Sequence, residues 1–125
     1  MSINLLKEIL NHNLDSGAAI VTSGTDGVHL ANTWNSYIRL ENDDTIYIPV
    51  GGMLQTEKNL KENGKILLSI TNREIQGFNF PGTGVLIEGT GEIVTTGDLV
   101  EKTKESYPWI RGVLVVKMNK VEQKL

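Results

Sequence analysis

Residues Ile48–Leu60, IPVGGMLQTEKNL, join an apolar strand-like run to a polar segment of helical character. Two glycines, Gly51 and Gly52, stand at the junction, just before the expected helix. The first N–H groups of a helix lack internal acceptors, and the helix dipole adds partial positive charge there. Glycine also lets a ligand approach the backbone, because it has no side chain. The stretch therefore predicts a strand–turn–helix unit whose turn can bind an anion such as phosphate.

A purely structural interpretation of this junction is also open. Neither GxGxxG nor GxxxxGK[ST] is present, so no standard phosphate-binding motif identifies it. Glycine is common where a strand turns into a helix, and Gly51 and Gly52 can serve only to turn the chain. Thr56 can cap the helix or give its hydroxyl to an anion. After Leu54 only Leu60 is strongly apolar, which predicts a surface helix with an accessible N-terminus.

Outward from this junction, strand-like segments outnumber helical ones. Short helices are expected at 3–14, 55–63 and 98–107, the last starting with a capping box at Asp98 and Glu101. Strands are expected at 17–23, 28–40, 45–50, 65–71, 85–96 and 111–118. Gly64 is placed to end the second helix, and Gly89 and Gly91 to bend a strand. The strands come in runs, so we expect one mainly β domain over residues 1–125, an antiparallel barrel of about six strands with two or three short helices.

The composition limits the classes of function. A net charge of -3 argues against a nucleic-acid partner, which needs a basic face. The absence of cysteine excludes disulfides, thiol catalysis and cysteine-ligated clusters. No apolar run approaches the roughly 20 residues of a membrane span, and Lys7 and Glu8 interrupt the apolar N-terminal segment. The sequence therefore predicts a soluble cytoplasmic protein with no membrane association.

A second unusual segment is Asn32–Tyr37, NTWNSY, which places many hydrogen-bonding groups inside an otherwise apolar strand. A buried polar group without a partner costs about 1–3 kcal/mol, so these groups need a ligand, a neighbouring strand or solvent. An exposed edge strand is the alternative to a ligand site. Trp34, Tyr37 and Trp109 are candidate walls for a planar ring, although tryptophan is by default a core residue.

No catalytic or metal site is predicted from the residues alone. No nucleophile stands beside a base, and no pair of carboxylates can be placed together from the sequence. His12 and His29 lie in different elements without clustered carboxylates, so neither predicts a metal ligand. Any redox chemistry would come from a bound cofactor.

The combined motifs HLANTWNSY, IPVGGM, QTEKNL and PGTG resemble those of the small FMN-binding proteins known from sulfate-reducing bacteria. Those proteins belong to the split-barrel flavoproteins related to pyridoxamine 5′-phosphate oxidase. The resemblance covers nearly the whole chain and implies a six-stranded Greek-key split barrel. It further implies a homodimer that binds one FMN per subunit, non-covalently and near the interface.

The resemblance also implies roles for particular residues. Asn32, Thr33 and Trp34 would line the flavin, with Tyr37 and Trp109 near its isoalloxazine ring. Pro49, Gly51, Gly52, Gln55 and Thr56 fall in the segment that would hold the ribityl phosphate. Asp15 matches an acidic position close to the flavin, and Leu125 matches a terminal leucine that shields the partner subunit's flavin.

One position departs from the family pattern. The family has a lysine immediately before the threonine that matches Thr56, whereas Gln55 stands here. One cation expected to pair with the phosphate is therefore missing, and Arg73 and Lys58 are candidate replacements.

Three functions follow as hypotheses. The first is an FMN-dependent electron carrier between partner proteins that the sequence does not identify. The second is a flavin-dependent oxidoreductase of the pyridoxamine 5′-phosphate oxidase group, although the tail NKVEQKL offers little to hold a substrate phosphate. The third is a barrel that binds haem, a deazaflavin or no cofactor.

Overall fold

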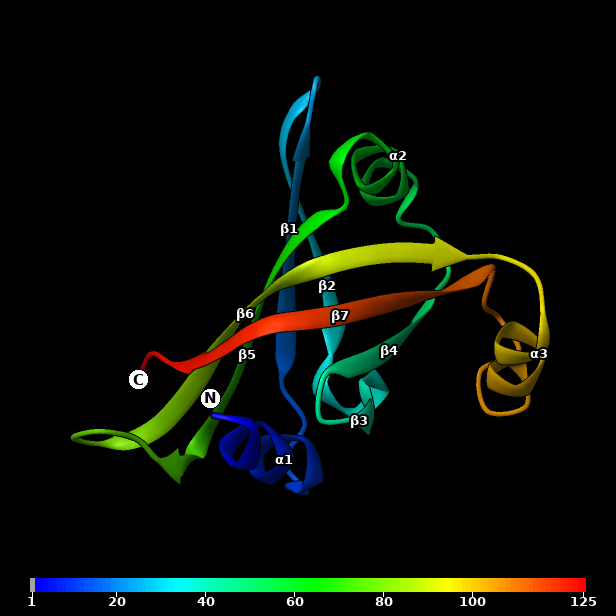
Figure 1. The fold of residues 1–125 in the computed structure, drawn as a ribbon. Helices are drawn as coiled ribbons and strands as arrows, with labels where there is room; N and C mark the ends of the chain where they lie inside the picture. Colours follow the sequence, from blue (N-terminus) through cyan, green and yellow to red (C-terminus); the bar gives the residue numbers. More distant parts are fainter. Residues whose placement is uncertain (1) are drawn as a thin grey trace.

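A computed structural model describes residues 2–125, which form one antiparallel sheet with three α-helices and a 3-10 helix (Figure 1). The elements are α1 (Ile3–Asn11), β1 (Gly17–Gly24), β2 (Gly27–Trp34), η1 (the 3-10 helix Asn35–Tyr37), β3 (Arg39–Asn42), β4 (Thr45–Val50), α2 (Leu54–Asn63), β5 (Lys65–Gln76), β6 (Pro81–Val94), α3 (Asp98–Lys104) and β7 (Gly112–Gln123). The strand order is β2-β1-β5-β6-β7-β4-β3. The predicted mainly β fold is confirmed, but the described residues form seven strands rather than six.

The additional strand arises because the predicted strand 28–40 is interrupted by η1. The Asp15 carboxylate accepts hydrogen bonds from the backbone N–H and the hydroxyl of Ser36, at 2.9 and 2.7 Å. The Asn35 side chain donates to the carbonyl of Thr71 at 2.8 Å. Such side-chain bonds compete with a strand ladder. The chain therefore turns at η1, and one predicted strand becomes β2 and β3.

The sheet curls into a barrel that strand pairing does not close. Among the described residues β2 and β3 are the two edge strands, yet η1 joins them directly. Figure 1 shows β1 and β2 running across the long strands β6 and β7. Gly89 allows part of this bending: the β6–β7 register shifts there, and a Cβ at Gly89 would lie 2.1 Å from the Lys117 carbonyl oxygen. The irregularity predicted at Gly89 is present, with Asn119 of β7 as the extra residue opposite Glu88 and Gly89.

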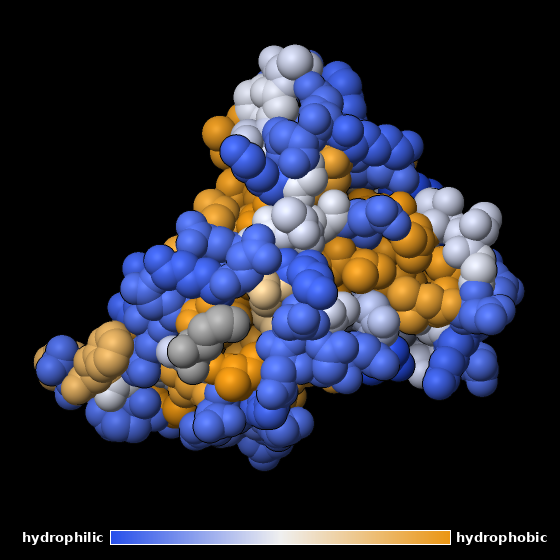
Figure 2. All heavy atoms as spheres, viewed as in Figure 1, coloured by the Kyte–Doolittle hydropathy of each residue, from blue (hydrophilic) through white to orange (hydrophobic). Residues whose placement is uncertain are grey.

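Alternate apolar residues of the strands fill the barrel interior. Its largest buried side chains include Ile20, Ile46, Ile48, Leu68, Ile70, Ile87 and Leu114. Each such burial contributes about 1.5–3 kcal/mol. Leu6 and Ile9 of α1 join this core. A smaller cluster, Val100, Ile110 and Val113, holds α3 against β7. Figure 2 shows hydrophobic surface between α2 and α3, at the end of the molecule where this smaller cluster lies.

Several predicted boundaries need correction. The first helix ends at Asn11 rather than Leu14, because His12 is extended (φ -73, ψ 145). The predicted capping box at Asp98 is wrong: Gly97 is the N-cap and no side chain caps α3. The predicted tail is part of β7, whose Glu122 pairs with Leu86 of β6. Gly64 ends α2 with φ +73, as predicted.

Candidate cofactor-binding site

A cavity of about 510 Å³ lies where the edge strand β2 approaches the end of β4. We call it the split cavity. Its lining residues are Gly17, Asn32, Thr33, Trp34, Tyr37, Pro49, Gly51, Gly52, Met53 and Trp109. The lining includes eight of the twelve predicted cofactor-binding residues: Asn32, Thr33, Trp34, Tyr37, Pro49, Gly51, Gly52 and Trp109. Its volume falls in the range of about 300–1,000 Å³ that is typical of small-molecule sites.

Aromatic side chains form one wall of the split cavity. The rings of Tyr37 and Trp109 lie 5.7 Å apart, and Tyr107 contacts both, at 5.2 and 5.9 Å between centroids. Trp34 and Trp109 are each 51% exposed. Half-exposed tryptophans are uncommon, because the indole is largely buried in most proteins. Tyr107 was missed by the sequence analysis, although the run Tyr107-Pro108-Trp109 places it beside a predicted residue.

The polar residues of β2 line the opposite side. Thr33 is 7% exposed and points inward, whereas Asn32 and Trp34 are exposed. The Asn32 side chain donates to the Ala18 carbonyl at 3.3 Å. The alternative interpretation of this segment, an exposed edge strand, therefore describes β2 correctly, and it does not conflict with a ligand site along the same edge.

The residues Gly51–Met53, which we call the glycine turn, connect β4 to α2. A Cβ placed on Gly52 would meet no atom within 4 Å, and one on Gly51 would lie 3.4 Å from the Trp109 ring. Met53 is the N-cap of α2 and adopts the left-handed conformation (φ 57). Within residues 2–125, no hydrogen-bond acceptor is recorded for the backbone N–H groups of residues 51–56. These donors, together with the bare glycine backbone, fit an anion.

Thr56 lies in the first turn of α2 and is fully buried. Its hydroxyl oxygen has no hydrogen-bond partner among the described residues, and no side chain caps α2. A buried hydroxyl without a partner is destabilising by about 1–3 kcal/mol. This orphaned group beside six unpaired N–H groups is a second observation that fits a bound anion. The helix lies on the surface as predicted, with Leu54 68% exposed, but Thr56, Asn59 and Leu60 form a buried face.

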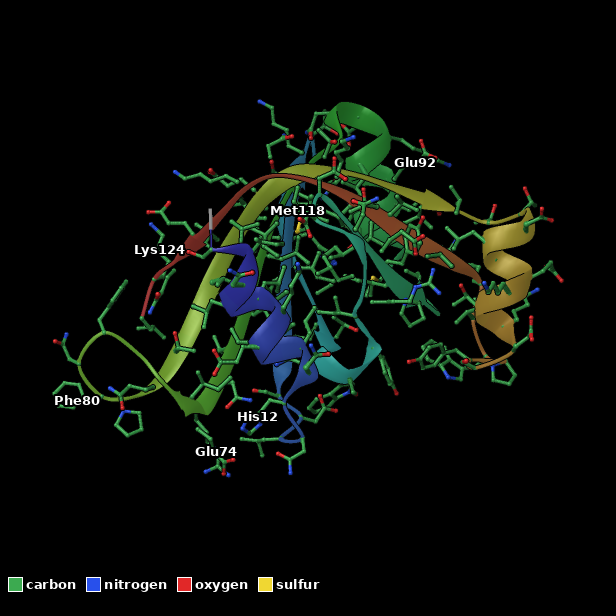
Figure 3. The ribbon with its side chains drawn as sticks, turned by 60° about the horizontal axis from the view of Figure 1, so that its bottom comes forward. His12, Glu74, Phe80, Glu92, Met118 and Lys124 are labelled. Carbon is green, nitrogen blue, oxygen red and sulfur yellow. The ribbon has the colours of Figure 1, made fainter. Side chains whose placement is uncertain are left out.

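Four predicted residues lie outside the split-cavity lining: Thr56, described above, and Gln55, Asp15 and Leu125. The Gln55 amide donates to Asp26 and Asn59, at 3.2 and 3.0 Å. Asp15 contacts Ser16 and Ser36 and anchors η1, which carries Tyr37. Leu125 lines a separate cavity of about 540 Å³ together with Phe78 and Phe80. Figure 3 shows Phe80 at the end of the β5–β6 hairpin.

The charges around the site come from residues beyond its lining. The Ser36 hydroxyl lowers the pKa of Asp15 below its ordinary value, although partial burial opposes the shift. Lys58, a candidate replacement cation, is paired with Asp26, and this contact lowers the pKa of Asp26. Arg73, the other candidate, lines the cavity that contains Leu125.

The nearest cation to the glycine turn is one that the sequence analysis missed, Arg111. Its guanidinium donates to the Gly51 and Gly52 carbonyls, at 3.3 and 2.6 Å, and pairs with Glu57 at 3.0 Å. The only signal in the sequence is that Arg111 follows Trp109 by two positions, just before the last strand.

Residues 2–125 contain neither a metal-ligand cluster nor a membrane-spanning helix. No group of three or more His, Asp or Glu side chains is arranged to hold a metal ion. None of the helices in this range has the length and apolar character needed to cross a bilayer.

Comparison with known proteins places the chain in a family. A curated FMN-binding protein of Nitratidesulfovibrio vulgaris (strain DSM 19637 / Miyazaki F) is 41% identical over 107 residues, which cover 86% of this chain and 87% of that protein. The fold is similar to that of an FMN-binding protein from Syntrophomonas wolfei subsp. wolfei, with a TM-score of 0.76, 20% identity, and coverage of 98% of this chain and 86% of that one. HupZ of Group A Streptococcus has a TM-score of 0.75 and 23% identity, with coverage of 94% and 90%. Residues 7–124 match the family described as pyridoxamine 5′-phosphate oxidase, and the chain belongs to that family.

Proposed function

We propose that this protein binds FMN non-covalently in the split cavity and carries electrons between partner proteins. The observation that carries the proposal is the gathering of eight predicted residues from separate segments into one cavity. The 41% identical relative is named an FMN-binding protein, which supports the same cofactor here. Bound FMN would supply an isoalloxazine ring that accepts and releases electrons. A cytoplasmic location, expected from the sequence, is part of the proposal.

The residues of the split cavity have complementary roles in this proposal. Trp34, Tyr37 and Trp109 offer aromatic surface to the flat ring, and Tyr37 and Trp109 already contact each other at 5.7 Å with a tilt of 43°. The N–H groups of residues 51–56 and the Thr56 hydroxyl hold the phosphate, which gives these donors a charged acceptor. Asp15 acts indirectly, because it fixes the turn that carries Tyr37.

A homodimer is also part of the proposal. Leu30 and Leu67 both pair with Val21, so the three side chains form a row on the outer face of β2, β1 and β5. Val28 and Leu30 are 79% and 60% exposed, and Leu67 is 38% exposed. An exposed apolar face of this kind is characteristic of a protein–protein contact, and a second copy supplies a matching apolar face.

Leu125 fits this arrangement as a residue that acts on the second copy. It is 57% exposed and lines a cavity other than the split cavity of its own chain. Its carbonyl oxygen is held by the Thr83 hydroxyl and the Gln123 amide, each at 2.9 Å. We therefore propose that the side chain is presented at a fixed position to the flavin of the partner.

A flavin-dependent oxidase is the second candidate, because the matched family is described as an oxidase. A substrate such as pyridoxamine 5′-phosphate needs cations for its phosphate. The split-cavity lining contains no lysine or arginine among the described residues, so we favour the electron carrier.

The test is a measurement on freshly purified protein. A yellow protein with an FMN spectrum that releases FMN on denaturation supports the cofactor assignment. Reversible reduction without turnover of pyridoxamine 5′-phosphate or NAD(P)H supports the carrier, whereas turnover of either compound supports the oxidoreductase. A colourless protein that does not bind added FMN refutes both, and a Soret band indicates haem instead.

A further inference from the structure

Arg111 donates hydrogen bonds to three consecutive backbone carbonyl groups, those of Val50, Gly51 and Gly52. Its backbone N–H donates to Val50 at 2.7 Å. Its side chain donates through Nε to the Gly51 carbonyl at 3.3 Å and through Nη2 to the Gly52 carbonyl at 2.6 Å. A single residue thus fixes three successive peptide planes.

The orientation of these planes determines where their N–H groups point. In a planar trans peptide, the N–H of one residue is directed opposite to the carbonyl of the preceding residue. The carbonyls of Val50, Gly51 and Gly52 all face Arg111, so the N–H groups of Gly51, Gly52 and Met53 face away from it. Those three residues line the split cavity and Arg111 does not. Arg111 therefore lies behind the turn, on the side opposite to the donors.

The guanidinium is itself held in place. Nη1 pairs with the Glu57 carboxylate at 3.0 Å, and the Glu57 side chain is only 16% exposed. Nε, Nη1 and Nη2 therefore each have a separate acceptor, which uses the planar fork of the guanidinium. Glu57 belongs to the first turn of α2, so the same contact joins Arg111 to the helix N-terminus. A lysine ammonium, with its donors on one atom, cannot span these three positions.

We infer that Arg111 is a positioning residue that orients the N–H groups of the glycine turn toward the phosphate of a flavin mononucleotide. Its positive charge also lies beside the turn, where the Gln55 side chain supplies none. This inference rests on the proposed function. It assigns phosphate selectivity to a residue that does not line the split cavity.

The test compares two ligands that differ by the phosphate alone, FMN and riboflavin. Apoprotein is titrated with each, and quenching of flavin fluorescence gives both dissociation constants. Hydrogen bonds to a charged group are worth about 1.5–3 kcal/mol, so Arg111→Gln is expected to weaken FMN binding about tenfold or more. Riboflavin affinity should change by less than about twofold, because riboflavin makes no phosphate contact.

Three further variants make the test specific. Arg111→Lys keeps the positive charge but removes the planar guanidinium with its separate donor atoms. Its loss of FMN affinity should therefore be nearly as large as that of Arg111→Gln. Glu57→Gln should produce a smaller loss, and it provides the test if Arg111→Gln does not fold. Lys120→Gln is the matched charge control: Lys120 is 57% exposed, pairs with Glu122 on β7 and does not line the split cavity, so both affinities should stay at the wild-type value.

The outcomes separate this inference from the proposed function. Wild-type protein that binds neither flavin overturns the proposed function, and this inference with it. Wild-type protein that binds FMN, with equal losses for FMN and riboflavin in Arg111→Gln, overturns only the positioning role and indicates general destabilisation. Unchanged FMN affinity in Arg111→Gln, or in Glu57→Gln where that variant is the test, also overturns the role.

Discussion

The substitution Gly52→Ala separates ligand binding from folding more cleanly than other changes in the glycine turn. A Cβ at Gly52 meets no protein atom within 4 Å, and Gly52 is not among the glycines with positive φ. Alanine in a backbone conformation that it can adopt stabilises a protein by about 0.4–1 kcal/mol, because the unfolded chain loses freedom. The free energy of unfolding of the apoprotein should therefore be equal to the wild-type value or slightly higher.

The FMN affinity of the same variant should fall. The added methyl group occupies the open space beside the unpaired N–H groups, so the phosphate can no longer approach them. Loss of one hydrogen bond to a charged group corresponds to about 1.5–3 kcal/mol, which is roughly a tenfold to hundredfold increase in the dissociation constant. Fluorescence titration of the apoprotein with FMN measures the affinity, and thermal unfolding followed by circular dichroism measures the stability. An unchanged dissociation constant would refute the assignment of this turn to the phosphate, and a lowered Tm would refute the claim that the space is open.

The remaining predictions address the buried hydroxyl, the acidic anchor and the dimer. Thr56→Val keeps the shape but removes the orphaned hydroxyl, so stability should be unchanged or raised while FMN affinity falls by roughly tenfold; equal affinity would contradict a phosphate contact. Ser36→Ala removes the hydroxyl that lowers the pKa of Asp15, so its pKa should rise toward the ordinary 3.8. A lowered folded-state pKa of Asp15 stabilises the fold at pH values above its unfolded-state pKa, and this stabilisation is lost as the pH falls through the folded-state pKa. The difference in stability between wild type and Ser36→Ala should therefore be constant near neutral pH and shrink below pH 3.8. Acid denaturation curves of the two proteins measure this difference. Leu30→Lys places a charge on the exposed face of β2, so light scattering should detect monomer, whereas the exposed Asn13→Lys should leave the wild-type mass; equal masses for both variants would refute this interface.

The sequence predicted the class of fold because most strands carry a local signal. Ile66, Leu68 and Ile70 alternate with polar or exposed residues along β5, and the first half of β4 alternates in the same way. The interruption at Asn35–Tyr37 could not be predicted in this way, because it depends on Asp15, which lies 21 residues before Ser36. A contact at that separation has no local pattern, and it changed one predicted strand into two.

In the candidate site too, features within one continuous stretch were predicted, and contacts between distant segments were not. Gly51, Gly52 and Thr56 lie in one continuous stretch, where the strand–turn–helix pattern suggested an anion site as one of two interpretations. Trp34 and Trp109 lie 75 positions apart, so no periodicity associates them; they were named together only as aromatic residues and through the family resemblance. Arg111 was missed because it contacts the glycine turn from the position just before β7, 54 residues after Glu57. Its contacts are to three backbone carbonyl groups, and such contacts cannot be predicted from the identities of the side chains.

The position of the phosphate in FMN-loaded protein tests the assignment of the glycine turn most directly. A crystal structure of the FMN-loaded protein measures this directly. We predict phosphate oxygens within about 2.7–3.2 Å of backbone nitrogens between Gly51 and Thr56, with the guanidinium of Arg111 on the far side of the turn. A phosphate bound instead beside Arg73 in the other cavity, with the N–H groups of the glycine turn facing solvent, would contradict it.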